Sequence, residues 1–267
     1  MTELAIDIVR KHYASSDVLA LKDLSFSVTS GKFVALVGPS GAGKTTILNS
    51  ILGLDNDYQG DVLVNAQSLK EVDVHPAKIG CMFQEPRLMP WMTVEQNLEL
   101  VLEGKSSDKQ LIRKVLEQVE LTERASSYPG HLSGGMQRRV ALARAFAVNP
   151  NLLLMDEPFL SLDEPSADRL RQLLYTLWQE LRPTVIFVTH NLREALALAD
   201  EIIFLSASPG TVIRHFPIDI KRPQQLDHSA ISELQERLLR ENPEILSGLA
   251  EENDGGNINP TQEQYLQ

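Results

Sequence analysis

The sequence has little cysteine, no long apolar run and no excess of positive charge. Its single cysteine, Cys81, excludes an internal disulfide and a zinc site built from several cysteines. Apolar runs such as Val185–Val188 are far shorter than the roughly 20 residues that a membrane-spanning helix requires. The first residues, Met1–Leu4, show neither the basic segment nor the apolar stretch of a secretory signal. These absences predict a cytoplasmic protein without a membrane span of its own.

Negative charge, by contrast, is plentiful, and the formal net charge is −11. A general nucleic-acid binder needs a basic face that neutralises phosphates, so we expect no nucleic-acid partner. More than half of the net charge comes from 241–267, which has no lysine or arginine. Its acids are Glu241, Glu244, Glu251, Glu252, Asp254 and Glu263. We expect 251–267 to form an acidic, flexible tail.

The most informative stretch is a glycine-rich loop of the pattern G-x-x-x-x-G-K-[ST], which cradles phosphates in nucleoside triphosphatases. Its residues are Gly38, Pro39, Ser40, Gly41, Ala42, Gly43, Lys44, Thr45 and Thr46. An apolar run of strand length, Phe33–Val37, precedes the loop, and apolar residues at helical spacing follow it. These flanks disfavour the alternative, a plain glycine-rich turn. Backbone N–H groups would bind phosphate oxygens, Lys44 the β- and γ-phosphates, and the Thr45 hydroxyl a Mg²⁺ ion.

Strand and helix patterns alternate around this loop. Strands are expected at 4–8, 19–21, 24–28, 33–37, 61–65, 79–83, 151–156, 184–189, 201–205 and 211–216. Helical spacing is expected after the loop, within 93–128, and at 132–148, 164–181, 192–199 and beyond 223. The alternation predicts an α/β fold, a P-loop NTPase core with a mostly parallel sheet, an N-terminal antiparallel β region and a helical sub-domain.

We expect three parts along the chain. Residues 1–222 would form the ATPase domain, with its helical sub-domain at about 88–150. Residues 223–250 would form a C-terminal helical extension, and the acidic tail at 251–267 would follow it. A chain of this length can bury a core large enough for one such domain.

Four polar residues fall at the ends of predicted buried strands: Gln84, Asp156, Glu157 and His190. Ligands of open α/β sheets bind at the carboxyl ends of the strands, so these side chains would reach a bound nucleotide. Asp156 suits a water-mediated Mg²⁺ contact, and Gln84 can reach the metal or the attacking water. Glu157 suits positioning or deprotonating that water, and His190 can bond a γ-phosphate oxygen. For each residue alone, the alternative is a strand-terminal polar group bonded to nearby backbone.

Ser133, Gly134 and Gly135 begin a predicted helix and offer a second anion site. The phosphate loop already accounts for one nucleotide, and a helix in a separate sub-domain would lie too far away to share it. A dimer resolves this difficulty, because each chain's segment can then face the γ-phosphate held by the other chain. A serine N-cap followed by two glycines, without any ligand, is the simpler alternative.

The order of several motifs along the chain is also informative. They are Tyr13, GPSGAGKTT at 38–46, Gln84, LSGGM at 132–136, LLLMDEP at 152–158, SLD at 161–163 and His190. In this order the chain resembles the ATP-binding subunits of ABC transporters over about residues 3–222. The position of Tyr13 alone leaves open whether it is a half-buried aromatic or a stacking surface for a base. The resemblance implies that Tyr13 stacks on adenine, Glu157 is the catalytic base and His190 contacts the γ-phosphate. It also implies that Asp163 belongs to a loop crossing a dimer interface.

By the same resemblance, ATP and Mg²⁺ are bound at two composite sites of a closed dimer, formed with a second copy of such a chain. Two integral membrane permease subunits are implied partners, with their coupling helices docking on the stretch after Gln84. A periplasmic or extracellular solute-binding protein would act indirectly. The chain would then be a peripheral protein on the cytoplasmic face of the inner membrane.

A finer resemblance concerns the stretch Phe83–Trp91, which is similar to the FQ…LLPW segment of nitrate, sulfonate and taurine importers. The stretch 205–212 with Lys221–Pro223 is similar to the same group, although Thr211 stands where that group usually has arginine. Met136 replaces the usual glutamine of LSGGQ, and Asn191 follows His190 where aspartate is commoner. Two alternatives remain: an exporter or lipid-trafficking ATPase, and a soluble non-transport ABC protein. The second would need basic patches or a second cassette, and membrane co-purification would distinguish it.

Overall fold

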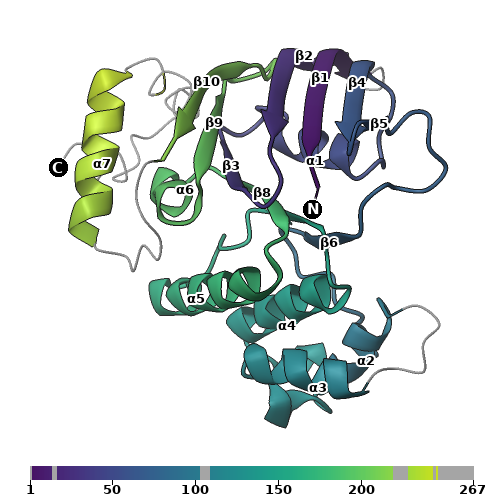
Figure 1. The fold of residues 1–267 in the computed structure, drawn as a ribbon. Coiled ribbons are helices and arrows are strands. Elements are labelled where there is room, and N and C mark those ends of the chain that lie inside the picture. Colours follow the sequence, from purple (N-terminus) through teal and green to yellow (C-terminus); the bar gives the residue numbers. More distant parts are fainter. Residues whose placement is uncertain (1, 14–16, 103–108, 219–227, 243–244, 246–267) are drawn as a thin grey trace.

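The structure, a computed structural model, describes residues 2–13, 17–102, 109–218, 228–242 and 245. Two sheets organise the described part of the chain (Figure 1). The antiparallel sheet has the strand order β2-β1-β4-β5. Its strands are β1 (Leu4–Tyr13), β2 (Val18–Val28), β4 (Gln59–Val64) and β5 (Gln67–Ser68). The predicted antiparallel region before the loop is thereby confirmed.

The second sheet has the strand order β10-β9-β3-β8-β7-β6. Its strands are β3 (Phe33–Val37), β6 (Ile79–Met82), β7 (Leu152–Asp156), β8 (Thr184–Thr189), β9 (Glu201–Leu205) and β10 (Val212–Pro217). All neighbours pair in parallel except β10, which runs antiparallel on the β9 edge. On β3, Ala35 and Val37 pack into one core while Val34 and Leu36 pack into the other. A strand buried on both faces reads as a continuous apolar run, which is why the sequence predicted it.

The prediction of two strands at 19–21 and 24–28 was wrong, because one continuous strand, β2, covers both. The polar residues Lys22 and Asp23 separate the two apolar patterns, and Asp23 has a positive φ of 47°. Pairing with the ten-residue strand β1 nevertheless carries β2 through this point. The first strand also runs beyond the predicted 4–8, so that Tyr13 is the last residue of β1.

Four helices lie beside the six-stranded sheet. They are α1 (Lys44–Ile51), α5 (Glu164–Leu181), α6 (Leu192–Leu198) and α7 (His228–Glu241). Helix α7 packs on α6 and buries Ile231, Leu234 and Leu238 in the larger core, so the helix predicted beyond 223 is confirmed. The predicted tail at 251–267 lies outside the described residues.

The remaining helices gather on the side of the molecule away from the antiparallel sheet (Figure 1). They are α2 (Val94–Glu99), α3 (Lys109–Gln118), the short 3₁₀ helices η1 (Thr122–Arg124) and η2 (Pro129–His131), and α4 (Gly134–Ala147). Val101 and Leu102 follow the end of α2 in tightened i→i−3 turns, although their spacing predicted a longer helix. Helix α4 contacts β6, and a side chain at Gly80 would collide with the Ala145 carbonyl. In the described part of the chain, no helix has the length and apolarity to cross a bilayer.

Candidate functional site

The glycine-rich loop connects β3 to α1, as the sequence predicted. Gly41 and Gly43 have φ angles of 80° and 77°, a left-handed conformation that glycine adopts without strain. A side chain at Gly43 would also collide with Leu21 of β2. The loop therefore turns tightly and delivers the chain to the start of α1, where backbone N–H groups are free of helical partners.

Lys44 is almost fully buried although it carries a charge. Its Nζ donates to the carbonyl oxygens of Gly38 at 2.6 Å and Pro39 at 2.8 Å. These bonds hold the lysine along the loop, while Ser40, Gly41 and Thr45 are exposed. The loop thus presents a fixed positive charge beneath an accessible surface, which suits a phosphate chain.

Two oxygen donors from distant parts of the chain converge beside the loop. The Thr45 hydroxyl donates to Asp156 Oδ2 at 3.0 Å, and Asp156 ends β7. Burial raises the pKa of Asp156, and the Thr45 hydrogen bond opposes that change. One hydroxyl and one carboxylate beside a phosphate loop fit Mg²⁺, which takes few protein ligands and completes its shell with phosphates and water. Gln84 lies two residues beyond the end of β6 with an exposed side chain.

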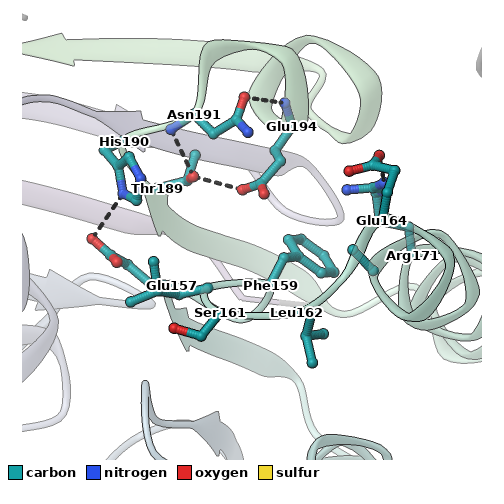
Figure 2. A pocket seen from close by; sticks show the side chains of 12 residues that line it. Glu157, Phe159, Ser161, Leu162, Glu164, Arg171, Thr189, His190, Asn191 and Glu194 are labelled. Carbon is teal, nitrogen blue, oxygen red and sulfur yellow. Dashed lines mark hydrogen bonds and ion pairs between the residues drawn. The ribbon is translucent and has the colours of Figure 1, made fainter. Parts of the chain in front are cut away.

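Glu157 and His190 both line a cavity of about 190 Å³, and their side chains point toward each other (Figure 2). His190 Nδ1 lies 3.4 Å from Glu157 Oε1. This contact lowers the pKa of Glu157 and raises the pKa of His190. Glu157 has a φ of 44°, and its N–H donates to the Val188 carbonyl at 3.0 Å. The predicted acid and histidine are therefore brought together at the carboxyl edge of the sheet.

Ser133 caps the N-terminus of α4, where its hydroxyl accepts the Met136 N–H at 3.3 Å. Ser133 is thus an N-cap, and both Ser133 and Gly134 remain exposed. One turn later, the buried Arg138 donates to the carbonyls of Pro158 at 3.0 Å and Leu160 at 2.7 Å. Arg138 was not predicted from the sequence, yet it ties α4 to the segment that carries Glu157.

Tyr13 lies beside the loop in a polar cluster that was also missed. Its hydroxyl lies 3.2 Å from Thr46 Oγ1 and donates to Asp55 Oδ2 at 3.3 Å. Lys11, only 2% exposed, lies with Nζ 4.6 Å from the centre of the Tyr13 ring. The same Nζ donates to Asp55 Oδ1 at 2.7 Å and to the Asp57 carbonyl at 2.8 Å. The Tyr13 ring is therefore held both at its hydroxyl and on its face.

Comparison with known proteins adds a family and several relatives. A family model described as "ABC transporter" matches residues 21–160. The chain is 37% identical to the "Aliphatic sulfonates import ATP-binding protein SsuB" of a Bacillus cereus strain, over 89% of this chain and 95% of that protein. It is 39% identical to the protein of the same name from Escherichia coli, over 90% of each.

Solved structures of ABC cassettes are also similar to this chain. One is described as a dimeric post-hydrolysis state of the ATP-binding cassette MJ0796 bound to ADP and Pi. It is 32% identical to this chain, with a TM-score of 0.71, and the match covers 83% of this chain and all of that one. A second dimeric structure of MJ0796, described as a bacterial ABC transporter cassette, matches at 33% identity with the same TM-score.

Proposed function

Because the chain belongs to the ABC transporter family, we propose that it is the ATP-hydrolysing subunit of an importer for small organic sulfonates or similar solutes. The chain is an ATPase cassette that binds nucleotide, in common with its relatives and structural neighbours. The proposed site of this subunit holds the nucleotide and not the solute. The solute class is therefore taken from the names of the relatives. One observation carries the catalytic proposal: Thr45, Asp156, Glu157 and His190 meet at one edge of the sheet.

In this proposal the nucleotide lies on the loop formed by Gly38, Pro39, Ser40, Gly41, Ala42, Gly43, Lys44, Thr45 and Thr46. Lys44 neutralises charge on the β- and γ-phosphates, and the N-terminus of α1 adds its partial positive charge. The Tyr13 ring stacks on the base. Thr45, Asp156 and Gln84 would hold Mg²⁺, which supplies charge neutralisation to the phosphates when it is bound.

Glu157 acts as the base. It takes a proton from a water molecule whose oxygen bonds to the γ-phosphorus, while the bond between that phosphorus and the ADP oxygen breaks. His190 bonds a γ-phosphate oxygen and, before nucleotide binds, pairs with Glu157. The lowered pKa of Glu157 keeps the carboxylate ionised near neutral pH, as a base requires.

A second copy of the chain completes each site. Ser133, Gly134 and Gly135 at the start of α4, of which the first two are exposed, would bind the γ-phosphate held by the partner. The dimeric cassette structures of the relatives support this arrangement. Opening and closing of the dimer would then couple ATP hydrolysis to transport.

Two integral membrane permease subunits would receive this motion, and a solute-binding protein outside the membrane would act indirectly. Trp91 supports a docking surface here, because it is 69% exposed in the stretch after Gln84. The turn that carries it is held by the fully buried Asn97, which accepts the Met89 N–H at 2.7 Å and donates to the Met92 carbonyl at 3.1 Å. In this proposal the chain is peripheral, on the cytoplasmic face of the inner membrane, and binds no nucleic acid.

The test replaces Glu157 with glutamine in the assembled transporter. We expect ATP turnover to fall by about 100-fold or more, with ATP binding retained, because the base is lost and the shape is kept. Uptake of a radiolabelled alkanesulfonate by cells should disappear with it. Glu123→Gln, an exposed acid of η1, is the matched control and should change neither.

Turnover near the wild-type rate in Glu157→Gln would refute the role of the base. Wild-type turnover that is rapid in a proven monomer, and independent of protein concentration, would refute the composite site. Uptake of other solutes but not of sulfonates would refute the solute class alone.

A further inference from the structure

The position of His190 depends on a short backbone segment between β8 and α6. The imidazole is about half exposed and contacts Glu157 at 3.4 Å. This contact is long, so the orientation of the ring also rests on the residues on either side of it. These residues are Thr189, which ends β8, and Asn191, which caps α6.

Three side chains around His190 form a closed ring of hydrogen bonds (Figure 2). The Thr189 hydroxyl donates to Glu194 Oε2 at 2.7 Å and accepts the Asn191 N–H at 3.0 Å. Asn191 Oδ1 in turn accepts the Glu194 N–H at 3.4 Å and the Arg193 N–H at 2.9 Å. His190 lies between two members of the ring but takes no part in it.

This ring differs from an ordinary capping box. In a capping box, the N3 side chain accepts the backbone N–H of the N-cap residue directly. Here the N3 residue, Glu194, accepts instead from the Thr189 hydroxyl, and that hydroxyl takes the N-cap N–H. The inserted hydroxyl joins the end of β8 to the first turn of α6, so His190 lies between a fixed Thr189 side chain and a fixed Asn191 N–H.

Burial strengthens the ring. Thr189 is 2% exposed, and burial raises the pKa of Glu194. Water therefore competes little for these bonds, and each is stronger than it would be at the surface. The buried Arg171 of α5 also faces the Glu194 carboxylate across the cavity, although its guanidinium pairs with Glu164 and Asp168.

We propose that Glu194 is a positioning residue for ATP hydrolysis: through the Thr189 hydroxyl, its carboxylate fixes the segment that aims His190. The inference rests on the proposed role of His190 at the γ-phosphate. Glu194 touches neither Glu157 nor the site of the phosphates in the described contacts, and it acts through the backbone on either side of His190.

The experiment compares variants of the full-length chain in ATP turnover and in nucleotide affinity. Glu194→Ala should lower kcat by about 10-fold, a change of about 1.4 kcal/mol in the barrier, while the Kd for ATP stays unchanged. Thr189→Val, which keeps the shape and removes the hydroxyl, should do the same. Glu194→Gln and Thr189→Ser keep an acceptor and a hydroxyl respectively and should retain most of the turnover.

A double-mutant cycle separates positioning from simple loss of stability. In a His190→Ala background, Glu194→Ala should cause no further loss of the residual turnover measured with radiolabelled ATP. A further 10-fold loss in that background, or a parallel loss in Glu194→Gln, would overturn the proposal. Full turnover of Glu194→Ala together with low turnover of His190→Ala would refute this inference alone. Full turnover of His190→Ala would instead refute the role of the histidine in the proposed function.

Discussion

At the scale of single residues, Lys11 is a buried charge that contacts a side chain of the proposed nucleotide site. A lysine that is only 2% exposed is costly unless it is paired, and Asp55 supplies the pairing at 2.7 Å. The same ammonium lies on the face of Tyr13, which we propose as the base platform. Lys11 and Asp55 therefore set the plane of the ring before a nucleotide arrives.

Replacing Lys11 with methionine should weaken ATP binding by about 3- to 10-fold, because the ring loses a cation–π contact of about 1 kcal/mol and its fixed plane. The kcat at saturating ATP should stay unchanged, since the phosphates are held elsewhere. Lys70→Met is a matched control, because Lys70 lies 4.2 Å from the ring centre of Tyr58 and does not touch Tyr13 in the described contacts. Titration with a fluorescent ATP analogue measures the ATP affinity of the two variants, and steady-state turnover measures kcat. Equal loss of affinity in the two variants would contradict the proposal that Lys11 holds the Tyr13 ring for stacking on the base.

The Glu157–His190 pair makes the stability of the nucleotide-free chain depend on pH. The hydrogen bond to Glu157 raises the pKa of His190 above its usual 6.5, and the same bond lowers the pKa of Glu157 below its usual 4.5. The stability from His190 is fully present below about pH 6.5 and is lost as pH rises through its raised pKa. The stability from Glu157 is present above about pH 4.5 and is lost as pH falls through its lowered pKa.

We therefore expect the pair to stabilise the fold most between about pH 4.5 and pH 6.5. Glu157→Gln should lower the thermal midpoint more at about pH 5.5 than at about pH 8.5, because the positive charge of His190 is lost as pH rises through its raised pKa. Scanning calorimetry without nucleotide measures the two differences. The idea fails if the gap between wild type and variant is the same at both pH values.

At the scale of elements, α4 connects three functional segments. Its N-terminus presents Ser133, its middle binds the carbonyls after β7 through Arg138, and its last turns hold the segment after Gln84. There Arg144 donates to the Pro86 carbonyl at 2.8 Å and the Arg87 carbonyl at 2.9 Å. A shift of α4 must therefore move the surroundings of Glu157 and of Gln84 together.

Arg138→Met should lower kcat by about 10-fold, because buried carbonyl acceptors would be left without donors and the segment after β7 would relax. ATP affinity should change little, since Arg138 does not reach the loop in the described contacts. Arg139→Met is the control: Arg139 donates to the Val119 carbonyl and to Glu120, and makes no bond to the segment after β7 in the described contacts. ATP turnover is measured in the two variants at equal folded fraction, which separates an effect on kcat from a loss of stability. Equal losses would mean that α4 matters only for stability.

The sequence predicted some elements more closely than others for physical reasons. The bounds of β8, α5 and β9 were predicted to the residue, because buried parallel strands and a long amphipathic helix have clear patterns. Lys11 could not be predicted as buried, since the alternation from Leu4 to Ile8 would turn it outward. Register shifts in the pairing of β1, between Ile8 and Arg10 and between Lys11 and His12, change the inward face.

The residues of the site also differ in how far the sequence predicts them. Polar residues that follow buried strands, such as Asp156 and His190, were predictable, because parallel strands end at one edge. Arg138 and Glu194 were not, since each lies within a helix and bonds a residue outside that helix. Their partners are backbone carbonyls and a hydroxyl, which leave no pattern in the sequence.

At the scale of the whole molecule, the two sheets are joined close to the loop. Lys22 donates to the Gly210 carbonyl at 3.0 Å, and Gly210 donates to the Ala20 carbonyl at 2.8 Å. This bridge attaches β2 to the turn between β9 and β10. The antiparallel sheet, which carries Tyr13, is thereby held against the sheet that carries the phosphate loop.

The strand order of the larger sheet also bears on how the protein is made. Strand β3, which leads into the loop, pairs in the described sheet with β8 and β9, about 150 residues later in the chain. A ribosome that adds about 5–20 residues per second needs roughly 8–30 s to reach β8 after it has made β3. For that time the apolar segment Phe33–Val37 has none of its native strand neighbours. The nascent chain therefore cannot bind nucleotide early, and its exposed strand is a natural client for chaperones until the last third of the chain emerges.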